Sequence, residues 1–375
     1  MNDLPEFFRG KKVLITGHSG FKGAWLSEIL LGFGAKVAGL ALKPHTRPSL
    51  FNLLRLKERT RNHFLDIRNF KNVSAVMEKE KPEIVFHLAA QPLVLKSYDD
   101  PLETFSTNVM GTVNLLQTVK ESSRVRAAVI ITTDKVYDNK ELDHAYREGD
   151  PLGGHDPYSS SKAAADIIAQ SYLKSFSLPL AIARAGNVLG GGDWGQDRIV
   201  PDIVRAVYEN GAKLLVRNPD AIRPWQHVLD PLCGYLLLAR GLYEGKKDLS
   251  GAWNFGPNDE SHQTVRKLLE NVLTGFGGRE YDISADASAN KHEAQLLKLD
   301  IAKANSFLNW RPRLDFEASV KLTVSWYKKF YEKKNSAVEL TGRQIKSFFS
   351  NEKFFSRGLP SGARRQAPGL SQKRL

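Results

Sequence analysis

Tyr158 and Lys162 are the residues of this chain whose types and spacing most directly imply chemistry. They lie four apart in the string Y-S-S-S-K, so both side chains share one face if the segment is a helix. An ammonium beside a phenol favours the phenolate, and we expect Lys162 to lower the pKa of Tyr158 from about 10 towards neutrality. Such a phenolate can take a proton from a sugar hydroxyl. The spacing also arises by chance on helices, so the pair is informative only together with its neighbours.

A glycine-rich turn upstream supplies the first neighbour. The string T-G-H-S-G-F-K-G places Gly17, Gly20 and Gly23 between an apolar strand and a helix. Small residues there let the backbone approach a pyrophosphate at the positive helix N-terminus, although the spacing differs from the common G-x-G-x-x-G. His18 and Lys22 could add positive charge near the phosphates or could be solvated. A dinucleotide beside a tyrosine base implies hydride transfer at a carbinol.

Thr133, Asp134 and Lys135 stand at the end of the apolar run 127–133. Open α/β sheets bind ligands at the carboxyl ends of their strands, so this hydroxyl, acid and amine should face the same pocket as Tyr158. The alternative is a helix cap followed by a surface lysine. The neighbouring base favours the catalytic interpretation.

The second strand, 36–42, ends without the acid that usually binds the adenosine ribose hydroxyls. Lys43 or Arg47 could instead favour a 2′-phosphate, so residue chemistry leaves NAD and NADP open. Asp66 follows the third strand and is placed to meet adenine. It could equally be a helix N-cap, which is the simpler interpretation.

Polar residues in loops of the second half could hold the rest of a ligand. Asn187 follows the strand A-I-A-R-A-G-N-V, and Arg198, Arg223 and His227 lie in or near loops. A nucleotide diphosphate needs such donors, because guanidinium pairs bidentately with phosphate oxygens. Taken singly, each is more often structural, and we favour Arg223 because the Pro-Trp that follows should fix its backbone.

Apolar runs alternate with helical patterns, which predicts a parallel sheet wrapped by helices. Expected strands are 11–17, 36–42, 63–67, 83–89, 127–133, 178–188 and 252–257. Expected helices are 20–33, 101–121, 157–176, 199–210, 262–274 and 315–333. The prediction is an α/β fold with a Rossmann-type doubly wound parallel sheet and a smaller C-terminal substrate-binding lobe.

Two discontinuous parts are expected. Residues 5–188, with about 225–256, should form the dinucleotide-binding domain, and 189–224 with 257–340 should form the lobe. The last stretch, 351–375, is basic and rich in Gly, Pro and Ser, so we expect it to be disordered.

Composition excludes several classes of protein. The 375 residues contain one cysteine, Cys233, which excludes an internal disulfide and a cysteine-cluster metal site, and we expect no metal. Neither a signal peptide nor an apolar run of about 18 residues is present, which indicates a cytoplasmic protein without a membrane span. Residues 341–375 carry eight Lys or Arg and one acid, so over half of the +13 net charge lies there. We therefore expect no specific nucleic-acid partner.

The motifs, taken together, resemble the extended short-chain dehydrogenase/reductase superfamily, and within it the CDP-glucose 4,6-dehydratases. The matching strings are TGHSGFKGAWL, PSLF, HLAAQPLV, NVMGTVNLLQ, TTDKVYDN, DPYSSSKAAAD, RAGNVLGGGDW, DRIVPD, RPWQHVLDPLCGYL and WNFGP. The most discriminating are G-H-x-G-F-K-G, D-K where dTDP-glucose enzymes have D-E, and R-P-W-Q-H-V.

The resemblance implies redox dehydration of CDP-glucose to CDP-4-keto-6-deoxyglucose, a step of deoxysugar biosynthesis such as that for lipopolysaccharide O-antigens. Tyr158, assisted by Lys162, would take the C4 hydroxyl proton while Thr133 holds that hydroxyl. Asp134 would protonate the departing C6 hydroxyl. Lys135 or a water would remove the C5 proton.

The same resemblance implies NAD as the cofactor and a homodimer as the assembly. The implied cofactor-binding residues are Gly17, His18, Gly20, Phe21, Lys22, Gly23, Asp66, Ile67, Leu88, Ala89, Ala90, Tyr158 and Lys162. Apolar residues that exceed one face of helices 102–121 and 157–176 suggest the dimer surface: Val109, Leu115, Leu116, Ile167 and Ile168. The rival functions are a 4-epimerase or reductase of another nucleotide sugar and, in another class, a non-catalytic dinucleotide sensor.

Overall fold

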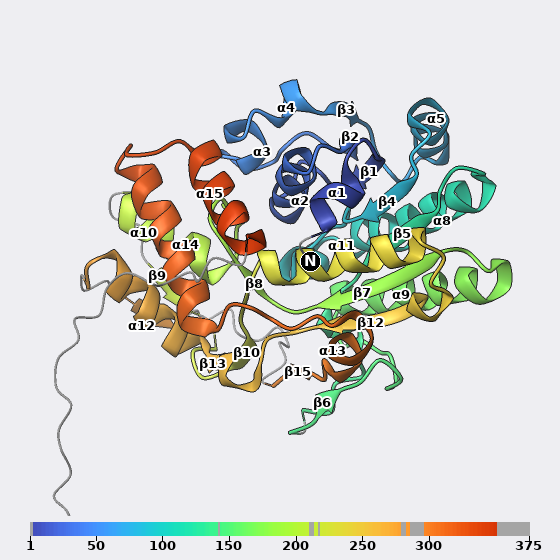
Figure 1. Cartoon of the computed structure of the whole chain (residues 1–375). Coiled ribbons are helices and arrows are strands. Elements are labelled where there is room, and N and C mark those ends of the chain that lie inside the picture. The colour runs from blue at the N-terminus through green and yellow to red at the C-terminus, as the bar shows by residue number, and fades with distance from the viewer. Residues whose placement is uncertain are drawn as a thin grey trace, which may run out of the picture.

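A parallel β-sheet with helices on both faces organises the computed structural model (Figure 1). The structure describes residues 3–350 except 142, 210–213, 217, 279–282 and 286–295. Within these residues the main sheet has seven strands, in the order β12 (Gly251–Phe255), β7 (Leu180–Ala185), β5 (Ala127–Ile131), β4 (Ile84–His87), β1 (Lys12–Thr16), β2 (Lys36–Ala41) and β3 (Arg61–Phe64).

The strands form because their apolar runs are buried on both faces. Val13 and Ile15 of β1 pack into one core, and Leu14 between them packs into the other. This double burial is typical of parallel sheets. The chain order reverses at β1, where Thr16 pairs with both Leu40 of β2 and His87 of β4. Ligands of such sheets bind at this reversal, beyond the carboxyl ends of the strands.

Each face of the sheet carries its own helices. The face of Val13 and Ile15 is covered by α1 (Leu4–Phe8), α2 (Phe21–Gly32), α11 (Leu229–Tyr243) and α15 (Ala337–Phe349). The face of Leu14 is covered by α5 (Phe70–Glu80), α8 (Gly111–Glu121) and α9 (Pro157–Phe176). Shorter helices lie between these elements along the chain: α3 (Leu50–Leu53), α4 (Leu56–Arg59), α6 (Val94–Asp99), α7 (Pro101–Phe105) and α13 (Ala302–Leu308).

Further elements gather beside the sheet, at the left of Figure 1. The helices of this group are α10 (Ile199–Tyr208), α12 (Val265–Phe276) and α14 (Phe316–Tyr331). Small two-stranded pairings join β9 (Leu214–Val216) to β14 (Ile283–Ala285), and β10 (Ile222–Pro224) to β13 (His262–Thr264). A third joins β8 (Val188–Leu189) to β11 (Gln226–His227). The pairing of β6 (Ala145–Tyr146) with β15 (Lys298–Leu299) lies apart from this group, at the bottom of Figure 1.

The predicted α/β fold class and all seven predicted strands are confirmed. The predicted helix 101–121 is interrupted by a π-helical segment, Ser106–Met110, where the Asn108 amide bonds Gln91 and Ser161 instead of facing solvent. Helix α11 was not predicted. None of the helices in the described residues has the length and apolar character that a membrane span requires.

The division into two parts remains a proposal. Helix α13 lies inside the predicted lobe, yet it packs against β12 of the sheet, and α15 packs against α2. The tail 351–375, predicted to be disordered, lies outside the described residues.

Candidate functional site

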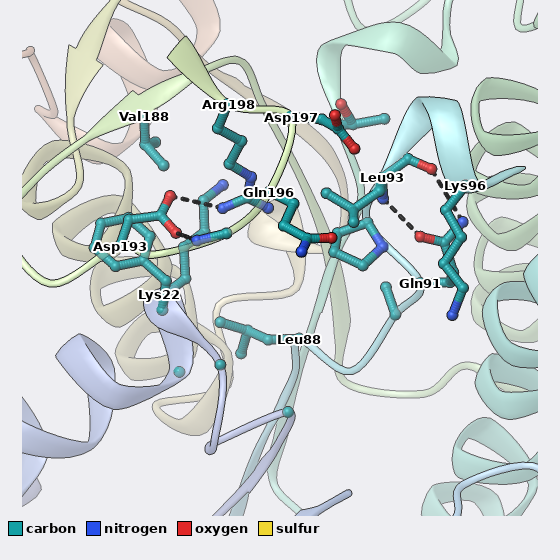
Figure 2. Close-up of a pocket in the computed structure, with 18 of the residues that line it drawn as sticks. Lys22, Leu88, Gln91, Leu93, Lys96, Val188, Asp193, Gln196, Asp197 and Arg198 are labelled. Atoms are coloured by element: carbon teal, nitrogen blue, oxygen red, sulfur yellow. Dashed lines mark hydrogen bonds and ion pairs between the residues drawn. The ribbon is translucent and has the colours of Figure 1, made fainter. Parts of the chain in front are cut away.

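One cavity of about 870 Å³ opens over the carboxyl ends of the central strands (Figure 2). Its lining runs from the turn after β1 to the loops that follow β7. Among the predicted site residues, those that line it are Gly17, Gly20, Phe21, Lys22, Gly23, Asp66, Ile67, Leu88, Ala89, Ala90, Thr133, Asp134, Lys135, Tyr158, Lys162, Asn187, Arg198 and Arg223. His18 and His227 are not among the lining residues.

The glycine turn after β1 brings three backbone segments into contact. Gly17 has φ +75°, and a Cβ there would lie 2.6 Å from the Ala89 nitrogen. A Cβ on Gly23 would lie 2.2 Å from the Gly17 carbonyl oxygen. Helix α2 begins at this turn with no side-chain cap on its first N–H groups. Free N–H groups at a helix N-terminus that faces a cavity suit an anionic group such as a phosphate.

His18 belongs to the protein core. Its imidazole is fully buried, stacks on Phe64 and hydrogen bonds Asn62 at 2.9 Å. A Cβ on Gly39 would touch the ring, so this strand glycine makes the space that His18 fills. Burial lowers the pKa of His18 to about 4, which keeps it neutral. The solvated alternative is wrong, and the imidazole does not face the cavity.

Tyr158 enters the cavity from the first turn of α9. Asp156 caps that helix by accepting from the Ser159 backbone N–H at 2.9 Å, and Pro157 occupies the first helical position, where a missing N–H costs nothing. The string D-P-Y-S therefore fixes where the helix begins. The Tyr158 phenol and the Thr133 side chain both line the cavity, and Thr133 lowers the pKa of the phenol.

Thr133 links the tyrosine to the acid beside it. Its hydroxyl donates to Asp134 Oδ1 at 2.9 Å and accepts from the Lys135 backbone N–H at 3.4 Å. The predicted cap is therefore present, and the capping hydroxyl also binds Asp134 in the cavity that Tyr158 lines. Asp134 is buried and packs against Gly186, where a Cβ would lie 2.9 Å from Asp134 Oδ2.

We predicted that Lys162 lowers the pKa of Tyr158, but the structure has the pKa of Tyr158 raised. Burial raises the pKa of Tyr158 to about 12, opposed by the Thr133 hydrogen bond. Lys162 does not bond the phenol, since its Nζ donates to the Ile131 carbonyl at 2.8 Å. Burial, then repulsion from Lys22, lowers the pKa of Lys162 to about 8. Four-residue spacing places both side chains on one face of α9 but does not make them touch.

Lys22, Asp193 and Arg198 form a charged cluster at one end of the cavity (Figure 2). Arg198 Nη1 donates to Asp193 Oδ2 at 2.8 Å, and Asp193 Oδ1 accepts from the Gly195 N–H at 2.9 Å. Burial, then repulsion from Arg198, lowers the pKa of Lys22 to about 8, while Asp134 and Asp193 oppose that shift. Lys22, in the first turn of α2, therefore lies where Arg198, Asp134 and Asp193 all act on its charge.

Asn187 and Arg223 line the cavity, but His227 does not. The His227 ring is fully buried, lies edge-on to Trp25, and has a pKa lowered to about 3 by burial. The prediction that it binds substrate is therefore corrected. Both residues of β11 are buried: the Gln226 amide donates to the Phe255 carbonyl at 3.0 Å, and the His227 ring packs against Trp25.

Asp66 lies at the opposite end of the cavity. Its carboxylate accepts from the Arg68 backbone N–H at 2.8 Å and pairs with the Arg68 guanidinium at 2.6 Å, which lowers its pKa. The residue that caps α5 is Asn69, so the helix-cap interpretation of Asp66 is wrong. Lys43 also lines this end, whereas Arg47 is not among the lining residues.

Sequence reasoning missed several residues that line the cavity. Figure 2 shows Gln196 and Asp197 above the cavity, opposite Lys96 of α6 and Gln91. Asp193 lies in the glycine-rich string G-G-G-D-W, and no role was predicted for it. An acid and an arginine five residues apart in such a loop were the signal for the Asp193–Arg198 ion pair.

No group of three or more His, Cys, Asp or Glu within the described residues is placed to hold a metal ion.

Known proteins resemble this chain in sequence and in fold. The sequence model of the GDP-mannose 4,6 dehydratase family matches residues 14–323. A CDP-glucose 4,6-dehydratase of Salmonella typhimurium is 46% identical over 92% of this chain and 98% of its own length. Among solved structures, a dTDP-glucose 4,6-dehydratase of Bacillus anthracis in complex with NAD superposes with a TM-score of 0.73, at 25% identity over 86% of this chain and 98% of that one. A Streptomyces venezuelae dTDP-glucose 4,6-dehydratase with NAD bound gives 0.74, also at 25% identity, over 86% and 98% of the two chains.

Proposed function

We propose that this chain, which belongs to the GDP-mannose 4,6 dehydratase family, converts CDP-glucose into CDP-4-keto-6-deoxyglucose with NAD as its cofactor. The observation that carries the proposal is that Tyr158, Thr133, Asp134 and Lys135 line one cavity with the glycine turn, where the Thr133 hydroxyl donates to Asp134. An epimerase or a reductase needs the tyrosine but has no use for an elimination acid and base.

The residues of the cavity fit NAD. A Cβ at Gly17 or Gly23 would collide with the backbone of Ala89 or of Gly17, so glycine at both positions keeps the turn tightly packed beside the N-terminus of α2, where the pyrophosphate would lie. Asp66 and Ile67 would meet the adenosine, and the Tyr158 end would receive the nicotinamide. NAD, when bound, supplies a hydride acceptor for C4 of the sugar and later a hydride donor for C6.

Oxidation at C4 depends on Tyr158. The phenolate takes the hydroxyl proton, and Thr133 holds that hydroxyl by a hydrogen bond. Burial raises the pKa of Tyr158 to about 12 although Lys162 lies in the next turn of the same helix, so the phenolate forms only when further positive charge lies beside it. The positively charged nicotinamide of NAD, when bound, would supply such charge.

Elimination depends on Asp134 and Lys135. The C4 ketone acidifies the proton on C5, and Lys135 or a water held by it removes that proton. Asp134 in its protonated form gives a proton to the departing C6 hydroxyl, which leaves as water. Thr133 donates to Asp134 and lines the same cavity as Tyr158, so the groups that would act on C4 and C6 are neighbours.

The test is incubation of the purified protein with CDP-glucose, followed by base treatment and measurement of the 4-keto-sugar absorbance. We expect absorbance with CDP-glucose that exceeds the signals with UDP-glucose and dTDP-glucose. Conversion to a 4-epimer without base-induced absorbance would support the epimerase alternative. Cofactor binding without any turnover would support the sensor alternative.

We further propose a cytoplasmic homodimer. Leu102, Met110 and Ile167 are apolar side chains that are 82%, 50% and 53% exposed, on α7, the π-helical segment and α9. Exposed apolar residues on neighbouring helices suit an isologous contact. Two residues predicted for that surface, Leu115 and Leu116, are instead buried in the core against the sheet.

A further inference from the structure

Arg184, next to the last residue of β7, is a fully buried charge. Its Nε and Nη2 donate to the two carboxylate oxygens of Asp166 on α9, each at 2.8 Å. Asp166 lies one helical turn beyond Lys162 on the same face. The ion pair therefore joins the helix that carries Tyr158 to the carboxyl end of β7, beside β5 in the sheet.

Arg184 also bonds the segment that carries the elimination residues. Its Nη1 donates to the Tyr137 hydroxyl at 2.9 Å and to the Glu148 carbonyl at 3.0 Å. Tyr137 lies two residues beyond Lys135 and donates to Asn254 Oδ1 at 2.7 Å. One guanidinium thus holds both the segment after β5 and the helix α9.

A second hydrogen bond joins the segment after β5 to the same ion pair. Thr132, the residue before Thr133, donates from its hydroxyl to Asp166 Oδ2 at 3.1 Å. The segment after β5 therefore reaches the Arg184–Asp166 pair through two independent side chains, Thr132 and Tyr137.

We propose that Arg184, with Asp166 and Tyr137, is a positioning centre that fixes the hydride-transfer pair relative to the elimination pair. The inference rests on the proposed function, because it assigns Tyr158 and Lys162 to one chemical stage and Asp134 and Lys135 to another. A buried ion pair is not needed for stability, since well-packed apolar residues often serve as well. Directional bonds to separate segments instead fix their mutual placement, on which rates in an active site depend steeply.

Replacing Arg184 or Asp166 alone would leave a buried charge unpaired and could unfold the protein. The test therefore uses Tyr137→Phe, which keeps the ring and removes only the hydroxyl between Arg184 and Asn254. Tyr146→Phe is the matched control. Its ring stacks on Tyr137 at 5.0 Å, but its hydroxyl bonds Asn139 and the Lys140 N–H and does not bond Arg184.

Single-turnover mixing with CDP-glucose separates the two stages, because reduced cofactor absorbs while elimination is pending. We expect Tyr137→Phe to oxidise C4 within about twofold of wild type but to slow elimination about tenfold or more, so that reduced cofactor accumulates. We expect Tyr146→Phe to follow wild type. Melting temperatures of both variants show whether a change in rates reflects placement or loss of fold.

The inference would be overturned if Tyr137→Phe and Tyr146→Phe accumulated the same amount of reduced cofactor. It would also be overturned if the slower elimination in Tyr137→Phe were explained entirely by a lower melting temperature. Failure of the proposed function gives a different result, since wild type itself would then produce no 4-keto sugar from CDP-glucose.

Discussion

Lys162 Nζ donates a hydrogen bond to the carbonyl oxygen of Ile131, the last residue of β5, at 2.8 Å. The bond anchors α9 to the strand end from which Thr133 and Asp134 continue. The ammonium is thereby held one turn along α9 from Tyr158, on the same face of the helix. We expect its contribution to catalysis to be positive charge at a fixed place.

Tyr158→Phe should abolish the base and leave the fold intact. The ring remains, and one lost hydrogen bond costs about 1 kcal/mol of unfolding free energy. Loss of general base catalysis should reduce turnover of CDP-glucose by about 10²–10⁴. Tyr172→Phe on the same helix is the control, because its hydroxyl bonds Gln117 away from the cavity. Wild-type turnover by a folded Tyr158→Phe protein would refute the assignment.

Lys162→Met should change how stability depends on pH. Burial lowers the pKa of Lys162 from 10.5 to about 8, so the unfolded chain binds more protons than the folded protein between those values. The contribution of Lys162 to the free energy of unfolding therefore rises across that window. The melting temperature of Lys162→Met minus that of wild type should be largest below pH 8 and should fall towards pH 10.5.

The control for this prediction is Lys174→Met, an exposed position in the last turn of the same helix. Its melting difference from wild type should stay constant over the same pH range. A constant difference for Lys162→Met as well would show that Lys162 keeps its ordinary pKa in the folded protein.

Much of the fold could be predicted because its signals are local. Each sheet strand is a short apolar run buried on both faces, and α9 begins where the string D-P-Y-S predicts. Helix α11 was missed because nearly all its residues are buried, so its sequence has no apolar stripe of helical period.

The site was harder to predict where tertiary packing decides a side chain's role. The imidazoles of His18 and His227 are groups that could bind a ligand, but both are buried. His18 fills the space beside Gly39, and His227 packs edge-on against Trp25. The pKa of Tyr158 could not be derived from the spacing to Lys162, because it depends on burial and on the Thr133 bond. Asp193 was missed because its pairing depends on the course of a loop.

Gly186→Ala should impair elimination more than oxidation. The added Cβ would lie 2.9 Å from Asp134 Oδ2 and 2.9 Å from Pro224 Cγ, so the carboxylate must move. We expect reduced cofactor to accumulate in single turnover, as it should in Asp134→Asn and Lys135→Met. Gly149→Ala, where a Cβ meets nothing within 4 Å, is the matched control. Normal dehydration by Gly186→Ala and Asp134→Asn would place the acid elsewhere.

Asp230→Asn should stabilise the protein at neutral and higher pH. Burial raises the pKa of Asp230 from 3.8 to about 7, and its Oδ2 has no hydrogen-bond partner among the described residues. The folded protein therefore binds more protons than the unfolded chain between those values, and stability is lost as pH rises through 7. The gain in melting temperature should grow from pH 5 to pH 8.

The control for this experiment is Asp248→Asn, an exposed acid in the turn before β12. Its melting temperature should differ from wild type by the same amount at both pH values. A gain for Asp230→Asn that is independent of pH would mean that Asp230 is ionised in the folded protein throughout this range.

Truncation after residue 350 should leave turnover of CDP-glucose within about twofold and should change melting little, because terminal residues that carry no site contribute little. All predicted site residues precede residue 228. Truncation after residue 336 is the contrasting variant. It removes α15, whose Phe348 is fully buried and whose Phe349 contacts Phe33 of the sheet domain at 5.1 Å between ring centroids. That variant should melt many degrees lower. Loss of turnover in the longer truncation product, with its melting unchanged, would instead show that the basic tail acts at the site or at the dimer surface.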